Sequence, residues 1–198
     1  MSALPPGPFA CILADPPWGF RTYSGDDAVP TLADDPYPTM TLEELCALPV
    51  SEVAAPDCLL VMWVISSHLP QALDVAEAWG FTYRSLGPVW LKDRHPDQIE
   101  MFDHGPICQL GMGYWFRQQA EIALVFGRGS PTRLNADVRQ VLSTPRREHS
   151  RKPDDIYGRV ERLVAGPYLE MFARQARPGW TAWGNQTDRF SPVDVEAA

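Results

Sequence analysis

The chain has 198 residues, of which 45% are hydrophobic and 21% charged, the composition of an ordinary globular protein of one domain. Its net charge of −8 argues against a non-specific coat for nucleic acid, because binding to phosphate depends on Lys and Arg. No apolar stretch approaches the roughly 18 residues of a membrane span, and the N-terminus lacks a basic region followed by a long apolar core. We therefore expect a soluble, cytoplasmic protein without a membrane segment.

The first apolar run, Phe9 to Leu13, predicts a buried strand of a parallel sheet, although periodicity alone does not exclude a buried helix. Pro16 and Pro17 follow closely and allow neither a helix nor a further paired strand, because each fixes φ and lacks an N–H. Asp15, a rigid backbone and Trp18 are thus expected at the carboxyl end of a strand. This is where α/β sheets bind ligands.

The stretch from Asp15 to Trp18 is suited to gripping an aromatic amine, a poor nucleophile whose lone pair is delocalised into the ring. If Asp15 and the Pro16 carbonyl each accepted one N–H, the nitrogen would become tetrahedral and its lone pair would be available to an electrophilic methyl group. Trp18 would stack on the base. The alternative is a proline-rich loop with Trp18 as part of the core.

The remaining chain alternates between strand-like and helix-like segments, which predicts a doubly wound α/β domain. Residues 19–40 form a loop longer than a plain connection requires, as expected of an active-site loop, and Thr41 to Glu44 is a capping box. The other expected strands are 58–65, 81–91 with an interruption at Gly87-Pro88, 121–126, 138–142, 168–173 and 181–184. The other expected helices run from Pro70 to Gly80 and from Lys152 to Val164.

The cysteines Cys11, Cys46, Cys58 and Cys108 are scattered, without a close pair or a nearby series of histidines. The spacing indicates neither a metal site nor a disulfide framework. We expect reduced thiols that pack as small hydrophobic side chains.

Positive charge is concentrated late in the chain. Residues 1–110 carry 4 basic and 15 acidic side chains, whereas residues 128–162 carry 9 basic and 5 acidic ones. These basic side chains either line one nucleic-acid groove or are solvated helix and loop faces. They are Arg128, Arg133, Arg139, Arg146, Arg147, Arg151, Lys152, Arg159 and Arg162.

The C-terminal third offers polar residues for a nucleotide-like cofactor. Glu170 lies near the end of a predicted strand, where an acid commonly binds ribose hydroxyls, although an ion pair with Arg174 is the alternative. Asn185 and Gln186 directly follow the last predicted strand. Lys152 precedes a helix N-terminus and could pair with a carboxylate, or be solvated. There is no Gly-x-Gly-x-x-Gly and no P-loop.

The ordered set of motifs resembles the DPPW adenine-N6 methyltransferases (MT-A type), which include the catalytic subunit of the eukaryotic messenger-RNA adenosine methyltransferase and its bacterial and phage relatives. The resemblance covers about residues 9–190. It rests on Ala14 to Trp18, Pro36 to Met40, Trp63-Val64, Trp90 to Lys92, Gly113 to Trp115, Ser150 to Gly158, Glu161 to Leu163, Glu170 to Arg174 and Trp183 to Gln186.

The resemblance implies a single methyltransferase domain over residues 1–198, with a core at about 9–190, active-site loops at 19–40 and 93–112, and a tail at 191–198. It implies S-adenosyl-L-methionine as donor and a Rossmann-like sheet with helices on both faces and the permuted, beta-class motif order. Catalytic roles fall on Asp15, Pro16, Pro17 and Trp18. Cofactor contacts fall on Asp15, Lys152, Glu170, Arg174, Asn185 and Gln186. Substrate contacts are expected from Trp18, Tyr37, Trp63, Lys92, Tyr114, Arg147 and Arg151, and no metal is expected.

Two departures from the eukaryotic relatives stand out. Their turn after the Arg174 position is longer and carries a His-Asn pair, where this chain has Gln175 to Arg177. Their upstream sequence supplies a contact to the cofactor adenine, whereas eight residues precede Phe9 here. Another segment, for example Gly179 to Trp183, would have to close that pocket.

We therefore expect transfer of a methyl group from S-adenosyl-L-methionine to the N6 amine of adenine in nucleic acid. DNA is favoured because the compact form resembles the bacterial and phage branch. The alternatives are RNA adenosine methylation, methyl transfer to a small molecule or protein amine, and a non-catalytic subunit that binds nucleic acid or protein. Sequence choice would come from the loops, the basic stretch 128–152, or a second subunit, either a copy of this chain or another protein.

Overall fold

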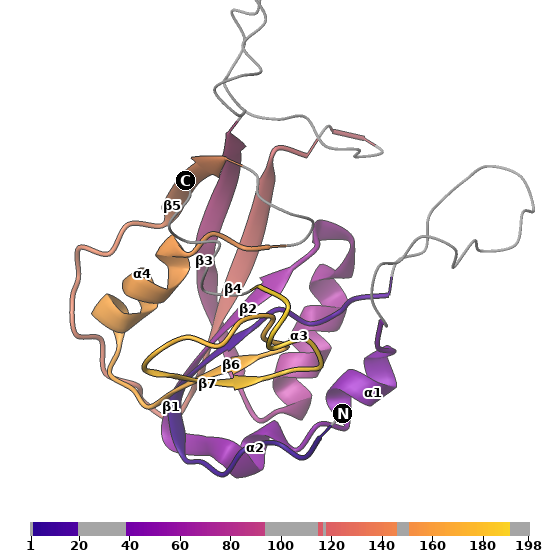
Figure 1. The fold of residues 1–198 in the computed structure, drawn as a ribbon, viewed down its shortest axis with the longest axis vertical. Helices are drawn as coiled ribbons and strands as arrows, with labels where there is room; N and C mark the ends of the chain where they lie inside the picture. Colours follow the sequence, from indigo (N-terminus) through magenta and orange to yellow (C-terminus); the bar gives the residue numbers. More distant parts are fainter. Residues whose placement is uncertain (1, 20–38, 94–114, 117, 146–150, 191–198) are drawn as a thin grey trace, which may run out of the picture.

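A computed structural model describes residues 2–19, 39–93, 115–116, 118–145 and 151–190. Seven strands form one sheet in the order β5-β3-β4-β2-β1-β6-β7 (Figure 1). The strands are β1 (Phe9–Ala14), β2 (Ala54–Val64), β3 (Thr82–Asp93), β4 (Ala120–Arg128), β5 (Val141–Pro145), β6 (Tyr168–Met171) and β7 (Trp180–Trp183). The helices are α1 (Leu42–Cys46), α2 (Val50–Val53), α3 (Leu69–Ala78) and α4 (Asp155–Leu163), with a 3-10 turn, η2 (Ser66–His68).

Strand β1 is central and lies parallel to both of its neighbours, β2 and β6. Strand β4 is antiparallel to β2 and β3, whereas the β3–β5 and β6–β7 pairs are parallel. The start of β4 therefore lies at the same edge of the sheet as the carboxyl ends of β1 and β2. The expected α/β fold, a sheet with helices, is confirmed, and the antiparallel strand β4 is the detail that no local pattern indicated.

Helices cover both faces of the sheet. Alternate residues of β1 point to opposite sides: Ile12 and Ala14 pack with α1, α2 and α3, and Cys11 and Leu13 pack with α4. Figure 1 shows α4 on one side of the sheet and α1 and α3 on the other. This two-sided burial explains why β1 is a continuous apolar run rather than an alternating one.

The predicted caps shape the first helical layer. The Thr41 hydroxyl accepts a hydrogen bond from the Glu44 backbone N–H at 3.2 Å, and the Glu44 carboxylate accepts one from the Thr41 N–H at 2.8 Å. This confirms the capping box. After α3, Gly80 adopts φ +82, a left-handed conformation that glycine tolerates best.

Several element boundaries differ from the sequence predictions. Strand β3 runs through Gly87-Pro88, with a register shift between Leu86 and Val89 rather than a break. A Cβ on Gly87 would lie 2.7 Å from the Val125 side chain, so the close approach of β4 requires glycine there. Strand β2 begins at Ala54, four positions before the expected residue 58, because it pairs with Phe9.

Two further differences concern short elements. Strand β5 is displaced toward the C-terminus relative to the predicted 138–142, because its pairing with β3 fixes the register from Val141 onward. Helices α2 and η2 were not predicted, since four-residue and three-residue turns leave no periodic pattern.

Three cysteines lie within the described residues and none forms a disulfide, as predicted. Burial raises the pKa of the Cys11 thiol and raises that of Cys58 to about 12, with Arg128 acting in the opposite direction on Cys58. Cys108 lies outside the described residues. Across the described ranges, no helix has the length and apolar character needed to cross a membrane.

Candidate active site

The ends of several strands bring polar side chains to one edge of the sheet. Ala14, the last residue of β1, pairs with Met62 of β2 and Met171 of β6. The next residue, Asp15, donates its backbone N–H to the Met171 carbonyl at 3.4 Å. Because β4 runs in the opposite direction, Glu121 near its start also reaches this edge. The sheet topology therefore places two carboxylates from distant parts of the sequence together.

The segment after β1 is held by its own backbone. Trp18 donates its N–H to the Pro16 carbonyl at 2.9 Å, and the Pro17 carbonyl accepts the Met40 N–H at 3.0 Å. A carbonyl oxygen has a second lone pair, so the Pro16 oxygen can still accept one N–H of an amine. The stiff turn that the prolines predicted is present.

Trp18 is part of the core rather than an open platform. Its side chain is 4% exposed and packs in the cluster that includes Ala14, and its Nε1–H donates to the Trp63 carbonyl at 3.3 Å. The ring of His68 lies 5.8 Å from the Trp18 ring. Trp18 is therefore part of the core, and it also lines the larger cavity described below.

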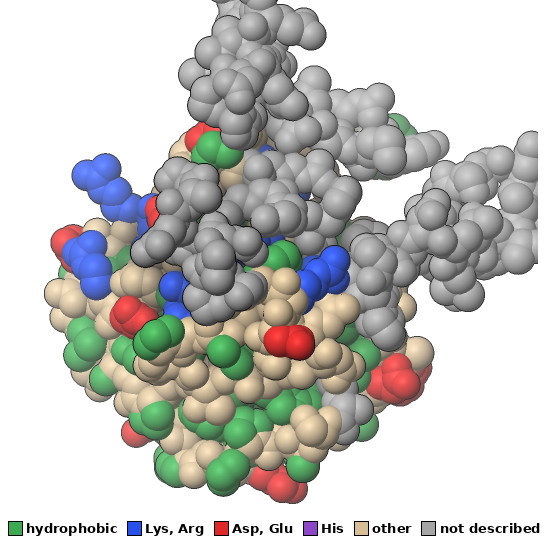
Figure 2. Space-filling model, in the orientation of Figure 1, with side chains coloured by type: hydrophobic (Ala, Val, Ile, Leu, Met, Phe, Trp, Pro, Cys, Tyr) green, Lys and Arg blue, Asp and Glu red, His purple; other side chains and the backbone are tan. Residues whose placement is uncertain are grey.

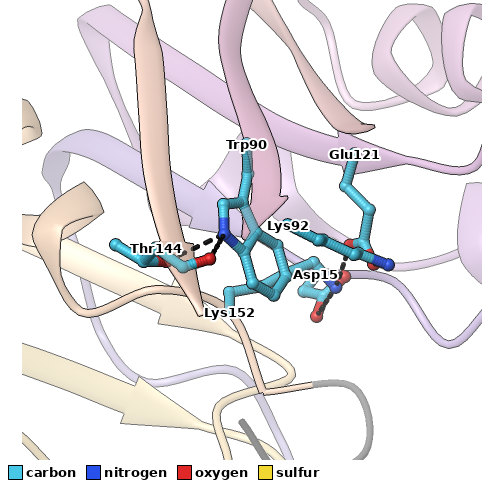
Figure 3. Close-up of polar contacts among 6 residues, drawn as sticks. All are labelled: Asp15, Trp90, Lys92, Glu121, Thr144 and Lys152. Atoms are coloured by element: carbon cyan, nitrogen blue, oxygen red, sulfur yellow. Dashed lines mark hydrogen bonds and ion pairs between the residues drawn. The ribbon is translucent and has the colours of Figure 1, made fainter. Parts of the chain in front are cut away.

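A chain of alternating charges crosses the site (Figure 3). The Lys152 ammonium lies 2.8 Å from the Asp15 carboxylate and 3.2 Å from the Glu121 carboxylate. Glu121 is also paired with Lys92, at 2.5 Å. These side chains are only 17–30% exposed, so water screens the interactions weakly. The order Asp15, Lys152, Glu121, Lys92 lets each carboxylate lie beside a cation.

The pKa values of Lys152 and Glu121 follow from these ion pairs. Burial by itself disfavours the charged form of Lys152, but the Asp15 and Glu121 carboxylates outweigh it and raise the pKa of the ammonium. Burial likewise opposes ionisation of Glu121, but Lys152 and Lys92 prevail and lower the pKa of its carboxyl group. Lys152 and Glu121 are therefore both charged at neutral pH.

Two cavities meet at these charges. The larger has a volume of about 370 Å³, and the smaller about 40 Å³. Both are lined by Asp15, Trp63, Lys152 and Arg174. The larger is also lined by Pro16, Pro17, Trp18, Val64, Ile65, Ser66, Gln118, Gln119, Ala120, Glu121 and Ile122. Asp15 is thus positioned to act on groups in either cavity.

Glu170 lines the smaller cavity and has one unsatisfied oxygen. The Tyr157 hydroxyl donates to its Oε1 at 2.8 Å, whereas its Oε2 is buried without a partner among the described residues. The pKa of Glu170 is raised to about 7, mainly by burial; the Asp15 charge also raises it, whereas the Tyr157 hydrogen bond and Arg177 lower it. A buried acceptor with no donor is suited to a ligand hydroxyl.

Tyr157, which donates the hydrogen bond to Glu170, is itself held in place. The Arg177 guanidinium lies 4.0 Å from the centre of the Tyr157 ring and donates to the Asp154 carboxylate at 2.6 Å. Arg177 belongs to the short turn that departs from the longer turn of the eukaryotic relatives. In this protein, Arg177 of the short turn contacts Tyr157, which holds Glu170 through its hydrogen bond.

The other predicted site residues take various positions. Trp63 is 2% exposed and lies beside Lys152, whose ammonium is 5.7 Å from the ring centre. Asn185 is exposed and Gln186 accepts a hydrogen bond from Arg189 at 2.8 Å; neither lines the two cavities. Tyr37, Tyr114 and Arg147 lie outside the described residues.

Arg151 is buried rather than facing nucleic acid. Its side chain is 5% exposed, donates to Gln175 at 3.2 Å and lies 4.7 Å from the Phe190 ring. It lines the smaller cavity together with Asp154. A phosphate contact by Arg151 does not fit this placement, because the guanidinium is enclosed by protein.

The described members of the basic stretch do not all lie in one groove. Arg128 donates to the Ser51 carbonyl at 2.6 Å, Arg162 pairs with Asp137 at 2.8 Å, and Lys152 lies in the site described above. On the face shown in Figure 2, the visible blue side chains lie at several separate places among tan, green and red ones. Of the seven described members, Arg133, Arg139 and Arg162 are exposed, and the alternative of solvated faces fits these three. Arg146 and Arg147 lie outside the described residues.

Sequence reasoning missed Glu121 and Tyr157. Glu121 lies at the start of an apolar strand. In a parallel sheet the start of a strand lies at the edge opposite the site, so Glu121 can be placed in the site only once the antiparallel direction of β4 is known. The local signal that could have found it is a single acid at the head of a buried strand. Tyr157 looked like part of an amphipathic helix, and only the packing of α4 on β6 shows its contact with Glu170.

Comparison with known proteins agrees with this geometry. The MT-A70 family model matches residues 9–186. The chain belongs to the MT-A70 family. It is 32% identical to the Type II methyltransferase M.MunI of a Mycoplasma species, over 91% of this chain and 78% of that protein. It is 32% identical to an N(6)-adenosine-methyltransferase MT-A70-like protein of Drosophila melanogaster and 30% identical to the human N(6)-adenosine-methyltransferase catalytic subunit METTL3.

The two eukaryotic matches cover 96% of this chain but only 29% and 30% of those longer proteins. The MT-A70 match covers all four residues of the alternating charges and the three carboxylates of the smaller cavity, Asp15, Asp154 and Glu170. The resemblance inferred from the DPPW stretch and the later motifs is therefore confirmed at the level of the family.

Proposed function

We propose that this MT-A70 protein transfers a methyl group from S-adenosyl-L-methionine to the N6 amine of adenine in nucleic acid, with DNA favoured over RNA. The observation that carries the proposal is the position of Asp15, which lines both cavities and is neutralised by Lys152. A carboxylate at a junction of two cavities can contact a donor in one and an acceptor amine in the other. This is the arrangement that group transfer between two ligands requires.

The smaller cavity is the proposed donor site. Its residues match the polar groups of the donor: Lys152 for the carboxylate, Glu170 for the ribose hydroxyls, and Arg174 beside them. The unpartnered Oε2 of Glu170 is the feature of the free protein that fits this ligand. S-adenosyl-L-methionine, when bound, supplies an electrophilic methyl group on a sulfonium centre. The donor also needs more space than about 40 Å³, so side chains here must move when it binds.

The larger cavity is the proposed site of the target base. Its volume of about 370 Å³ lies in the range of small-molecule pockets, and it contains both Asp15 and the Pro16 backbone. Asp15 and the Pro16 carbonyl would each accept one N–H of the amine. This localises the nitrogen lone pair for attack on the methyl carbon, and a carboxylate lies where the nitrogen must release a proton.

Lys152 connects the two sites. In the free protein it neutralises Asp15 and Glu121. A donor carboxylate would compete with Asp15 for the ammonium and leave the Asp15 carboxylate available to the amine. Glu121 and Lys92 keep the remaining charges paired during this exchange. We therefore expect the donor to bind before the base.

DNA is favoured because the chain is 32% identical to the Type II methyltransferase M.MunI, the match that covers most of the matched protein. The chain spans most of the Type II methyltransferase M.MunI but less than a third of METTL3. RNA methylation remains the second candidate, because the other relatives are named as adenosine methyltransferases. Loops 19–40 and 93–112, or a second subunit, would then select the sequence that is methylated.

The test is a pair of measurements on wild-type protein. Calorimetry with S-adenosylhomocysteine, the demethylated donor, should show binding, and labelled donor with DNA or RNA should yield N6-methyladenine. Binding without methylation of any nucleic acid would favour a small-molecule or protein amine as substrate. No binding would favour the non-catalytic subunit and remove the proposal.

A further inference from the structure

A third cavity lies on the α4 face of the sheet, away from the charges described above. Its volume is about 310 Å³. It shares no lining residue with the larger active-site cavity and only Ile156 with the smaller one. Its floor is formed by apolar side chains of β2, β3 and β4, and its walls by α4 and the segment 131–140. The floor and helix residues are Leu59, Val61, Leu86, Val125, Ile156, Val160, Leu163 and Val164.

The wall segment is held in place on both sides of the cavity. On the α4 side, the Leu134 N–H donates to the Leu163 carbonyl at 2.8 Å and the Asn135 side chain donates to the Arg162 carbonyl at 2.7 Å. On the β3 side, Gln140 donates its side-chain amide to the Leu86 carbonyl at 3.2 Å. The segment therefore bridges the cavity without collapsing onto the apolar floor.

The cavity is open to solvent on one side and has an apolar floor. Val61, Ile156 and Val160 on its floor and wall are 1–2% exposed, and Leu86 at its margin is 43% exposed. The cavity thus has a buried apolar floor and an accessible mouth, as a ligand site does.

Charge defines the class of ligand. Three arginines line the cavity, Arg133, Arg139 and Arg159, and none of its lining residues is acidic. The Arg159 guanidinium is fixed, because one of its nitrogens donates to the Arg139 carbonyl at 2.6 Å and the Val141 carbonyl at 2.7 Å. In a protein of net charge −8, this concentration of positive charge beside an apolar cavity favours an anion with an apolar body.

We propose that this cavity binds a small amphipathic anion, with its carboxylate or phosphate at the three arginines and its apolar part on the floor. A volume of about 310 Å³ corresponds to about ten water-sized or methylene-sized groups. Octanoate, with an eight-carbon chain and one carboxylate, is a probe of this size. The site is separate from methyl transfer, so its occupancy does not depend on the donor or on nucleic acid.

The experiment is a titration of the full chain with octanoate, octyl phosphate and 1-octanol, followed by calorimetry and by methyl NMR of the valines. Octanoate should bind with a dissociation constant of about 1 mM, as expected for a ligand of this size, and at least about tenfold more tightly than 1-octanol. A comparison of the two anions shows whether the arginines prefer carboxylate or phosphate.

Two pairs of variants locate the site. Leu86→Trp fills the mouth of the cavity at an exposed position, and Leu134→Trp places the same side chain on a residue that is 54% exposed and outside the lining. Only Leu86→Trp should abolish binding. The double variant Arg133→Gln, Arg139→Gln should weaken octanoate at least about tenfold and leave 1-octanol unchanged, whereas Arg84→Gln, outside the lining, should alter neither.

Each other outcome overturns the proposal. Equal binding of octanoate and 1-octanol would show that the arginines do not select an anion. Binding that survives Leu86→Trp would place the probe elsewhere on the protein. If neither anion saturated the protein at concentrations up to 20 times the expected dissociation constant, the cavity would not be a site for small anions. An acidic protein segment would then be the next occupant to test.

Discussion

Glu170→Gln offers a test in which stability and function respond in opposite directions. The pKa of Glu170 is raised to about 7 from its ordinary value of 4.5, with burial as the main cause. Between these values the folded protein retains a proton that the unfolded chain has lost. The contribution of Glu170 to stability is therefore fully present below pH 4.5, declines as pH rises, and is lost above about pH 7.

The size of the effect follows from the same interval. At about 1.4 kcal/mol for each pH decade, the interval from 4.5 to about 7 corresponds to about 3 kcal/mol. Glutamine does not ionise and can still accept the Tyr157 hydrogen bond. We expect Glu170→Gln to match wild type near pH 4.5 and to exceed its free energy of unfolding by up to about 3 kcal/mol at pH 8.

The assay is urea unfolding at intervals from pH 4.5 to 8.5, with Glu77→Gln, an exposed carboxylate on α3, as the matched control. The control should remain parallel to wild type. Donor affinity at pH 8 should fall in Glu170→Gln, because a charged acceptor for the hydroxyls is removed. If the free energies of unfolding of wild type and Glu170→Gln differed by the same amount at every pH, the claim that buried Glu170 retains a proton in the folded state would be refuted.

Three further substitutions test other parts of the structure. Asp15→Asn should lower kcat at least about 100-fold, while the urea midpoint changes little because Lys152 keeps Glu121 as a partner. Near-normal turnover in a steady-state assay would show that the Asp15 carboxylate has only a structural role. Trp18→Ala should destabilise the fold by about 3–5 kcal/mol, because the side chain is 4% exposed and its indole N–H donates to the Trp63 carbonyl. A normal urea midpoint together with weakened base binding would contradict this and favour stacking of Trp18 on the base. Thr41→Ala should destabilise by about 1 kcal/mol through loss of the capping box, and unfolding curves that overlay wild type would contradict it.

Local patterns were sufficient for most of the secondary structure. The apolar run before Asp15 predicted β1, Thr41 predicted the start of α1, and Gly80 predicted the end of α3. These signals are local because each reflects the conformational preference or hydrogen bonding of a few neighbouring residues. The register of β5 and the passage of β3 through Gly87 depend instead on strands distant in sequence.

The site was predictable only in part for the same reason. Asp15 follows a strand, Lys152 precedes a helix and Glu170 lies near the end of a strand, so their convergence at one edge could be inferred. Glu121 could not be placed without knowing that β4 runs antiparallel to its neighbours. The burial of Trp18 and Arg151 also depends on tertiary packing, and the sequence gives no local sign of it.

The central claim is methyl transfer to the adenine N6 amine at Asp15. Its most direct test is incubation of wild type and Asp15→Asn with labelled S-adenosyl-L-methionine and mixed pools of DNA and RNA, followed by mass spectrometry of the nucleosides. We expect labelled N6-methyladenine from wild type, with more in DNA than in RNA, and almost none from Asp15→Asn. Label in another nucleoside, or equal N6-methyladenine from both proteins, would contradict it.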